Sequence, residues 1–309
     1  MKVLLICKEM IGYERTAIMV LGSRLKESGH EVKAAVLKRP LTKAEKKKKN
    51  TEVEFPLHSE AYAAEDAEEV WKNTNINGGL SDLRSTKGIK FNEALIKALS
   101  FQPDVVGYSV MTGEHYDILE FNKILKEKMK FISVMGGPHP TFNKTVIEEE
   151  GIDAICTGEG DIAFDEFINN IENKKEYWLT KSFYVKHNGE IFKNGLGPLV
   201  DDLDDLPYPD RDLLYDADPS LAEVGLKSFI AGRGCPYKCS YCFNKQYNDN
   251  YKGLGKIIRA RSPEKVIREI EGVLNKYPLN MVNMNDDVFM LKPNGWIKEF
   301  SKLYKETQT

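Results

Sequence analysis

Short apolar runs alternate with amphipathic helical segments through the first half of the chain, and this alternation limits the fold more than any other feature. Each run has the length of a buried strand, and the segments between them repeat apolar residues at helical spacing, as at Ile118, Phe121 and Leu125. Strands that alternate with helices build a parallel sheet covered on both faces. The pattern therefore predicts an α/β fold with a doubly wound parallel sheet of five strands: Lys2–Lys8, Val32–Leu37, Asp104–Val110, Phe131–Met135 and Asp153–Cys156.

The loops after these strands are the expected ligand site, because doubly wound sheets bind ligands beyond the carboxyl ends of their strands. Three of the four loops combine glycine with small or polar residues, so a large ligand could approach the backbone closely. There is no G-x-G-x-x-G sequence after the first strand and no Walker sequence, which argues against a simple dinucleotide. The four loops are Glu9–Tyr13, Ser109–Gly113, Gly136–Thr141 and Thr157–Gly160.

Composition narrows the class of protein further. A length of 309 residues suggests two domains at about 150 residues each, and a net charge of −3 gives no general attraction to nucleic acid or anionic lipid. No apolar run approaches the roughly 18 residues of a membrane span, and the apolar run at the N-terminus is too short for a secretory signal. Five cysteines, an odd number, do not form a disulfide framework. We therefore expect a cytoplasmic protein with no nucleic-acid partner and no membrane span.

The chain divides at a connecting segment. Residues 38–90 interrupt the alternation as a charged insertion, to which we assign no function. Asn188-Gly189 between two strand-like runs predicts a hairpin, and the acidic, proline-containing stretch Asp201–Pro209 that follows suits an exposed strap between domains. These features predict a first domain over 1–180, a hairpin and linker over 181–224, and a second domain over 225–309.

Three cysteines within eight residues carry the strongest chemical signal. Cys235, Cys239 and Cys242 form a C-x3-C-x2-C motif directly after a predicted strand at Leu226–Ala231. A structural zinc site or a four-cysteine electron-transfer cluster needs a fourth ligand, and no histidine or further cysteine follows the triplet. The favoured interpretation is an iron–sulfur cluster with one iron open to another ligand, with zinc kept as an alternative.

The triplet resembles the motif of the radical SAM family, C-x3-C-x-aromatic-C, with Tyr241 in the aromatic position. The resemblance implies a 4Fe-4S cluster held by Cys235, Cys239 and Cys242, whose open iron binds S-adenosylmethionine (SAM). One electron would then cleave SAM to a 5′-deoxyadenosyl radical, which implies a flavodoxin or ferredoxin as electron donor. By the same resemblance, Tyr241 would pack on the adenine, and Asp286 and Asp287 would face the SAM amine.

The first half is similar to the cobalamin-binding branch of that family, whose members carry a flavodoxin-like domain before a (β/α) barrel. Gly136–Thr141 and Thr157–Asp161 resemble the branch's loops after the fourth and fifth strands, and Leu203–Pro209 resembles its linker. The mutase motif D-x-H-x-x-G is absent, since its place reads Lys8–Gly12, so the lower face of the cobalt should lack a histidine ligand. The expected cobalamin contacts are Met10, Gly12, Ser109, Met111, Thr112, Gly136, Gly137, Gly158, Glu159 and Gly160.

Residues 225–309 are too few for a whole barrel, since each β/α unit takes about 30 residues. We therefore expect the start of a partial radical SAM barrel, either in a fragment of a longer protein or in a chain that a partner completes. The implied activity is methyl transfer to an unactivated carbon or phosphorus of a small molecule, lipid or peptide. Alternatives are a cyclisation or rearrangement enzyme, and a non-catalytic cobalamin-binding remnant or split subunit.

Overall fold

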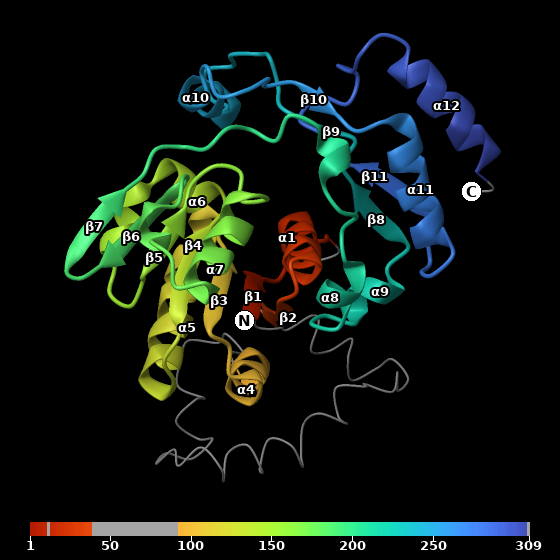
Figure 1. The fold of residues 1–309 in the computed structure, drawn as a ribbon. Coiled ribbons are helices and arrows are strands. Elements are labelled where there is room, and N and C mark those ends of the chain that lie inside the picture. The colour runs from red at the N-terminus through yellow and green to blue at the C-terminus, as the bar shows by residue number, and fades with distance from the viewer. Residues whose placement is uncertain (11–12, 39–91, 308–309) are drawn as a thin grey trace, which may run out of the picture.

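The structure is a computed structural model that describes residues 1–10, 13–38 and 92–307 (Figure 1). Its main sheet has seven strands in the order β2-β1-β3-β4-β5-β6-β7, with β1 to β5 parallel. This 2-1-3-4-5 order is that of flavodoxin-like sheets, as predicted. The parallel strands are β1 (Lys2–Lys8), β2 (Glu31–Leu37), β3 (Val105–Ser109), β4 (Ile132–Gly136) and β5 (Ala154–Cys156).

The hairpin belongs to this sheet, which corrects its placement in the linker 181–224. Its strands are β6 (Phe183–His187) and β7 (Glu190–Lys193), and β6 pairs antiparallel with β5. Phe183 and Val185 are buried in the core on one face of the sheet. Asn188 and Gly189 both have positive φ, as the predicted tight turn requires. The turn was therefore predicted correctly, but the apolar side chains of β6 make it part of the first domain.

Helices cover both faces of the sheet. α1 (Thr16–Glu27) and α7 (Ala163–Glu172) pack on one face, and α4 (Asn92–Phe101) and α5 (His115–Lys128) pack on the other. The core on the first face also takes in α8 (Arg211–Tyr215), a short helix after the acidic strap. The shorter elements are α6 (Pro138–Phe142) and the 3-10 helices Thr112–Glu114, Lys144–Glu148, Tyr177–Leu179 and Leu203–Asp205.

The C-terminal part contains two parallel strands, each followed by a helix, as predicted for the start of a (β/α) barrel. β8 (Leu226–Phe229) and β11 (Met281–Met284) are parallel, and α11 (Pro263–Leu274) and α12 (Trp296–Glu306) pack against them around Phe229, Ile270 and Trp296. Ser262 caps α11 by accepting a hydrogen bond from the Lys265 N–H. The remaining elements are α9 (Ser220–Glu223), β9 (Gly232–Arg233), α10 (Phe243–Asn250) and β10 (Arg259–Ala260), and β9 pairs antiparallel with β10.

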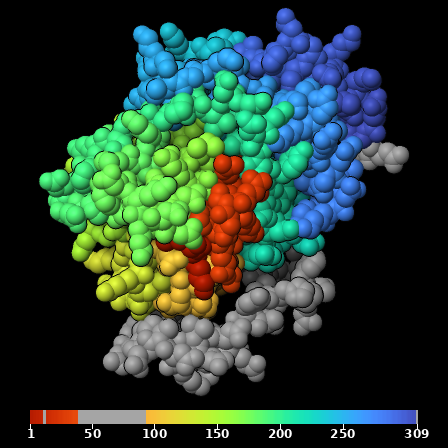
Figure 2. Space-filling model, viewed as in Figure 1, coloured from red at the N-terminus to blue at the C-terminus, as the bar shows by residue number. Residues whose placement is uncertain are grey.

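The two parts of the chain meet along α1, which Figure 2 shows between the green segments of the first domain and the teal and blue segments of the second. A buried ion network crosses this boundary. Arg211 contacts Glu14 at 2.5 Å and Glu269 at 2.9 Å, and Glu269 also contacts Arg261 at 2.6 Å. Within the described ranges, no helix is both long and apolar enough to cross a membrane.

Candidate functional site

The predicted cobalamin residues gather at one edge of the first sheet, where parallel strands end. Ser109 and Gly136 are the last residues of β3 and β4, and Met111, Thr112 and Gly137 follow within three residues. Met10, after β1, and Met111 leave 37% and 42% of their surface exposed, so two thioethers stand open at this edge. Gly12 lies outside the described residues. The structure thus groups the predicted loops, and their contact with cobalamin stays a prediction.

Gly137 explains why the loop after β4 needs glycine. Its φ is +98°, and a Cβ there would lie 3.0 Å from the carbonyl oxygen of Val110 at the end of β3. The N–H of His139 donates to the same Val110 oxygen at 3.1 Å. The loop after β4 therefore lies tightly against the loop after β3, leaving a backbone-lined surface.

Two histidines stack at the same edge. The rings of His115 and His139 are 4.2 Å apart and nearly parallel, and His139 Nδ1 lies 3.5 Å from Thr112 Oγ1. Burial, together with the neighbouring His115, lowers the pKa of His139, which favours the neutral ring. His139 Nε2 is buried and has no hydrogen-bond partner among the described residues. A buried polar atom without a partner, at the same sheet edge as the exposed Met10 and Met111, fits an edge that takes a large, partly apolar cofactor.

The cysteine loop runs from β9 to α10. Cys235 is buried, Cys242 half-buried and Cys239 exposed, and all three thiols are free. Gly234 has a φ of +93° because the carbonyl oxygen of Ile257 occupies the place of a side chain. In the described part of the chain, no three His, Cys, Asp or Glu side chains are gathered closely enough to hold a metal ion. The donor set of three free thiols fits an iron–sulfur cluster chemically, although the loop does not bring the sulfurs together.

The predicted SAM residues differ in their surroundings. Asp287 accepts hydrogen bonds from the Gly234 N–H at 3.2 Å and from Asn244 Nδ2 at 3.0 Å. It therefore contacts the chain just before and just after the three cysteines. Asp286 is almost fully buried, where it pairs with Lys292 at 2.6 Å and accepts from the backbone at 3.0 Å. Tyr241 is 92% exposed. Their roles toward SAM stay predictions, and the geometry gives Asp286 a structural partner that the sequence did not reveal.

The loop after β5 brings the two parts of the chain together. Gly158 and Gly160 lie in this loop, but the carboxylate of Glu159 is engaged by Arg259 at 2.7 Å and Arg233 at 3.2 Å. The side chain of Glu159 is therefore held by these arginines, and its contact with cobalamin stays a prediction. Sequence reasoning missed both arginines, because an isolated arginine carries no motif.

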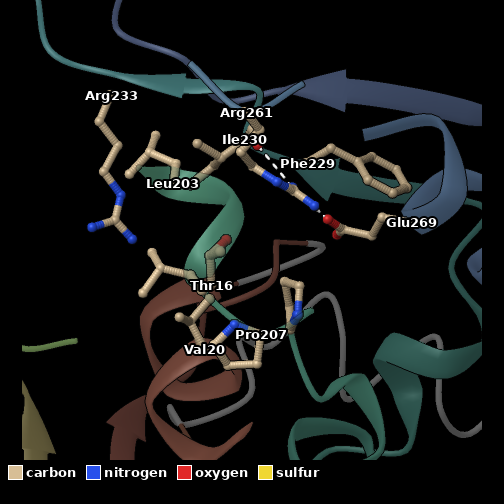
Figure 3. Close-up of a pocket in the computed structure, with 11 residues that line it drawn as sticks. Thr16, Val20, Leu203, Pro207, Phe229, Ile230, Arg233, Arg261 and Glu269 are labelled. Atoms are coloured by element: carbon tan, nitrogen blue, oxygen red, sulfur yellow. Dashed lines mark hydrogen bonds and ion pairs between the residues drawn. The ribbon is translucent and has the colours of Figure 1, made fainter. Parts of the chain in front are cut away.

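A shallow cleft lies elsewhere on the boundary between the two parts, and Figure 3 shows Arg261 and Glu269 joined at its wall. None of the predicted cofactor residues lines it. The cleft reaches the cysteine segment at Arg233 but contains none of the three cysteines. Its lining comes from α1, the strap, β8, β9, α11 and the residue after β10: Thr16, Val20, Leu203, Leu206, Pro207, Pro209, Phe229, Ile230, Arg233, Arg261 and Glu269.

Comparisons with known proteins bear on the same regions. The B12-binding domain family matches residues 80–168, which include β3, β4 and β5 with their loops. An uncharacterized methyltransferase of Pyrococcus horikoshii is 32% identical over 198 residues, or 62% of this chain and 41% of that protein. An anaerobic magnesium-protoporphyrin IX monomethyl ester cyclase of Rubrivivax gelatinosus is 26% identical over 243 residues, or 74% of this chain and 42% of that protein. The chain thus spans about two fifths of these curated relatives.

Several solved structures are similar to nearly the whole chain. One of them is that of OxsB, described as a cobalamin-dependent S-adenosylmethionine radical enzyme with aqua-cobalamin and S-adenosylmethionine bound. The TM-score is 0.67 at 17% identity, and the match covers 99% of this chain and 37% of OxsB. At this identity the likeness concerns the fold, and it supports a flavodoxin-like domain followed by the start of a barrel.

Proposed function

We propose that this chain, which fits a B12-dependent radical SAM family, is the part of an enzyme that binds cobalamin at the open edge of its first sheet and a 4Fe-4S cluster on its cysteine loop. One observation carries the proposal: α6, which follows the loop after β4, is in contact with the start of α10, which follows the cysteine loop. The ring of Phe142, after β4, lies 5.7 Å from the ring of Phe243, the residue after Cys242. Figure 1 shows α10, which begins at Phe243, next to the end of the sheet where α6 lies.

Different residues would bind the cluster, SAM and cobalamin. Cys235, Cys239 and Cys242 would hold the cluster as thiolates, and Asp287 keeps the first residue of the loop in place through the Gly234 N–H. When bound, the cluster supplies the electron that cleaves SAM to a hydrogen-abstracting radical, and cobalamin supplies the methyl carrier. The exposed ring of Tyr241 would cover the adenine, and the loops after β1, β3 and β4 would contact the corrin.

Methyl transfer is the reaction we propose, because a relative at 32% identity is named a methyltransferase. The cyclase among the relatives supports ring closure as a second candidate. We further propose a flavodoxin or ferredoxin as electron donor and a reducing, cytoplasmic setting, which the five free cysteines support. The substrate would be a small molecule, lipid or peptide.

Release of 5′-deoxyadenosine tests this proposal. The chain is reconstituted anaerobically with iron and sulfide, reduced, and incubated with SAM and hydroxocobalamin. We expect 5′-deoxyadenosine from the wild-type chain and none from Cys239→Ala, because a lost thiolate leaves the cluster without one of its three ligands. Cys156→Ala is the matched control, since its thiol is buried in β5 away from the loop. Absence of product from a fully loaded wild-type cluster would favour a non-catalytic cobalamin-binding subunit.

A further inference from the structure

Two acidic side chains in the loop after β5 meet two arginines of the β9–β10 ribbon. Arg233 Nη1 and Nη2 donate to the two carboxylate oxygens of Asp161 at 2.7 and 3.0 Å. Arg259 donates to both oxygens of Glu159 at 2.9 and 2.7 Å. Arg233 and Arg259 are directly paired across the ribbon. The ribbon thus presents two forked donors side by side to one loop of the first domain.

A third contact fixes the same loop from the other end of α10. The hydroxyl oxygen of Tyr251 accepts a hydrogen bond from the Glu159 N–H at 2.8 Å. The hydroxyl also lies 1.9 Å from where a Cβ on Gly158 would be, so only glycine leaves room for it. Tyr251 directly follows α10 and is almost fully buried.

These contacts hold the cysteine segment at both ends. Arg233 stands two residues before Cys235, and Tyr251 stands at the end of the helix that starts after Cys242. Both reach the Gly158–Asp161 loop, which carries three of the predicted cobalamin residues. A change in the position of this loop must therefore move Arg233 and Tyr251, which lie at the two ends of the cysteine segment. A change in the position of the cysteine segment must likewise move the loop.

The charges involved are mostly out of water. The side chains of Glu159, Asp161 and Arg259 are 10%, 8% and 3% exposed. Separating such a pair leaves an unpaired buried charge, which costs far more than breaking a surface ion pair. The contacts therefore act as a stiff connection with one favoured geometry.

We propose that Glu159, Asp161, Arg233, Arg259 and Tyr251 form a clamp that couples the two cofactor sites, so that cluster assembly and cobalamin binding each strengthen the other. They are positioning residues, and this inference rests on the proposed function. A cofactor that orders one end of the clamp removes part of the ordering entropy that the other cofactor would otherwise have to overcome. Because such coupling is reciprocal, it can be measured from either side.

The test compares the Kd of hydroxocobalamin for the chain with and without a reconstituted cluster. In the wild type we expect the cluster to lower this Kd about tenfold, within the usual range of coupling between sites. In Asp161→Asn the ratio should fall to about one, and Asp161→Glu should restore part of it. Asp165→Asn is the matched control, because Asp165 is also buried but contacts Arg24, at 3.5 Å, within the first domain. An unchanged ratio in Asp161→Asn would overturn the clamp.

Amide hydrogen exchange of the cofactor-free chain gives a second, independent result. Asp161→Asn should raise exchange across residues 233–251, although the substitution lies in the other domain, and Asp165→Asn should not. If the wild-type chain bound no cobalamin with or without the cluster, the proposed function would fail. The exchange result would still show whether the clamp connects the two domains. Faster exchange confined to residues near 161 would contradict it.

Discussion

Asp161 is a buried carboxylate whose ionisation makes the stability of the chain depend on pH. Burial by itself would raise the pKa of Asp161, but the charge and hydrogen bonds of Arg233 outweigh it and hold the pKa below its usual value. A carboxyl with a lowered pKa stabilises the folded state above its unfolded pKa of about 3.9, and this contribution is lost as the pH falls toward the folded pKa.

The predicted consequence is a pH-dependent effect of Asp161→Asn. At pH 7 the substitution should lower the free energy of unfolding by about 2 kcal/mol, less than a fully buried pair because Arg233 is 26% exposed. At about pH 3 the difference from wild type should shrink, since the carboxyl of the unfolded wild-type chain is then mostly protonated and folding must release that proton. Urea unfolding at both pH values measures it, and a difference that grew on acidification would contradict this ion pair.

Residue types with their own chemistry were predictable from the sequence, and residues that act through partners were not. The sequence spacing C-x3-C-x2-C is recognisable as a metal-ligand motif in Cys235, Cys239 and Cys242. Arg233 and Arg259 are ordinary arginines until the fold places them opposite Glu159 and Asp161. Asp286 was expected at the SAM amine, but its surroundings include Lys292, six residues later, which no motif indicates.

At the scale of elements, the β6–β7 hairpin is an integral part of the first domain. Phe183 in β6 is completely buried, and its ring stacks 4.2 Å from that of Phe167 in α7. We expect Phe183→Ala to lower the free energy of unfolding by about 3–5 kcal/mol, as for other buried phenylalanines. Phe192→Ala in β7 is the control and should have a much smaller effect, because Phe192 is only partly buried. An effect of Phe183→Ala as small as that expected for Phe192→Ala in chemical denaturation would place the hairpin outside the core.

The long periodic elements could be predicted from the sequence, while the short ones could not. The five parallel strands follow from continuous apolar runs, with ends that differ from the prediction by at most one residue. β9 and β10 are two residues each and have no period to detect. α10 reads Phe-Asn-Lys-Gln-Tyr-Asn-Asp-Asn and lacks an apolar stripe, so it forms in the context of the cysteine loop. The helix that follows the cysteine loop was therefore missed.

At the scale of the whole molecule, polar contacts join the two domains at two separate places. One is the buried Glu14–Arg211–Glu269–Arg261 network beside α1, and the other is the clamp between the β5 loop and the β9–β10 ribbon. Two contact regions fix an orientation better than one, because a single point allows rotation. The loop after β5 and the segment that carries the three cysteines are thereby held together, and that juxtaposition could not be predicted from motifs that lie far apart in the sequence.

Metal content of the anaerobically reconstituted chain tests the central claim most directly. Mass spectrometry after removal of loosely bound metal should find about four irons per chain, together with about one cobalt when hydroxocobalamin is supplied. Cys235→Ala should lose the iron and still bind cobalt when hydroxocobalamin is well above its Kd, because the predicted cobalamin residues all lie in the first domain. Zinc in place of iron, or iron that survives loss of Cys235, would contradict a cluster on this loop. Iron without cobalt would contradict the cobalamin site.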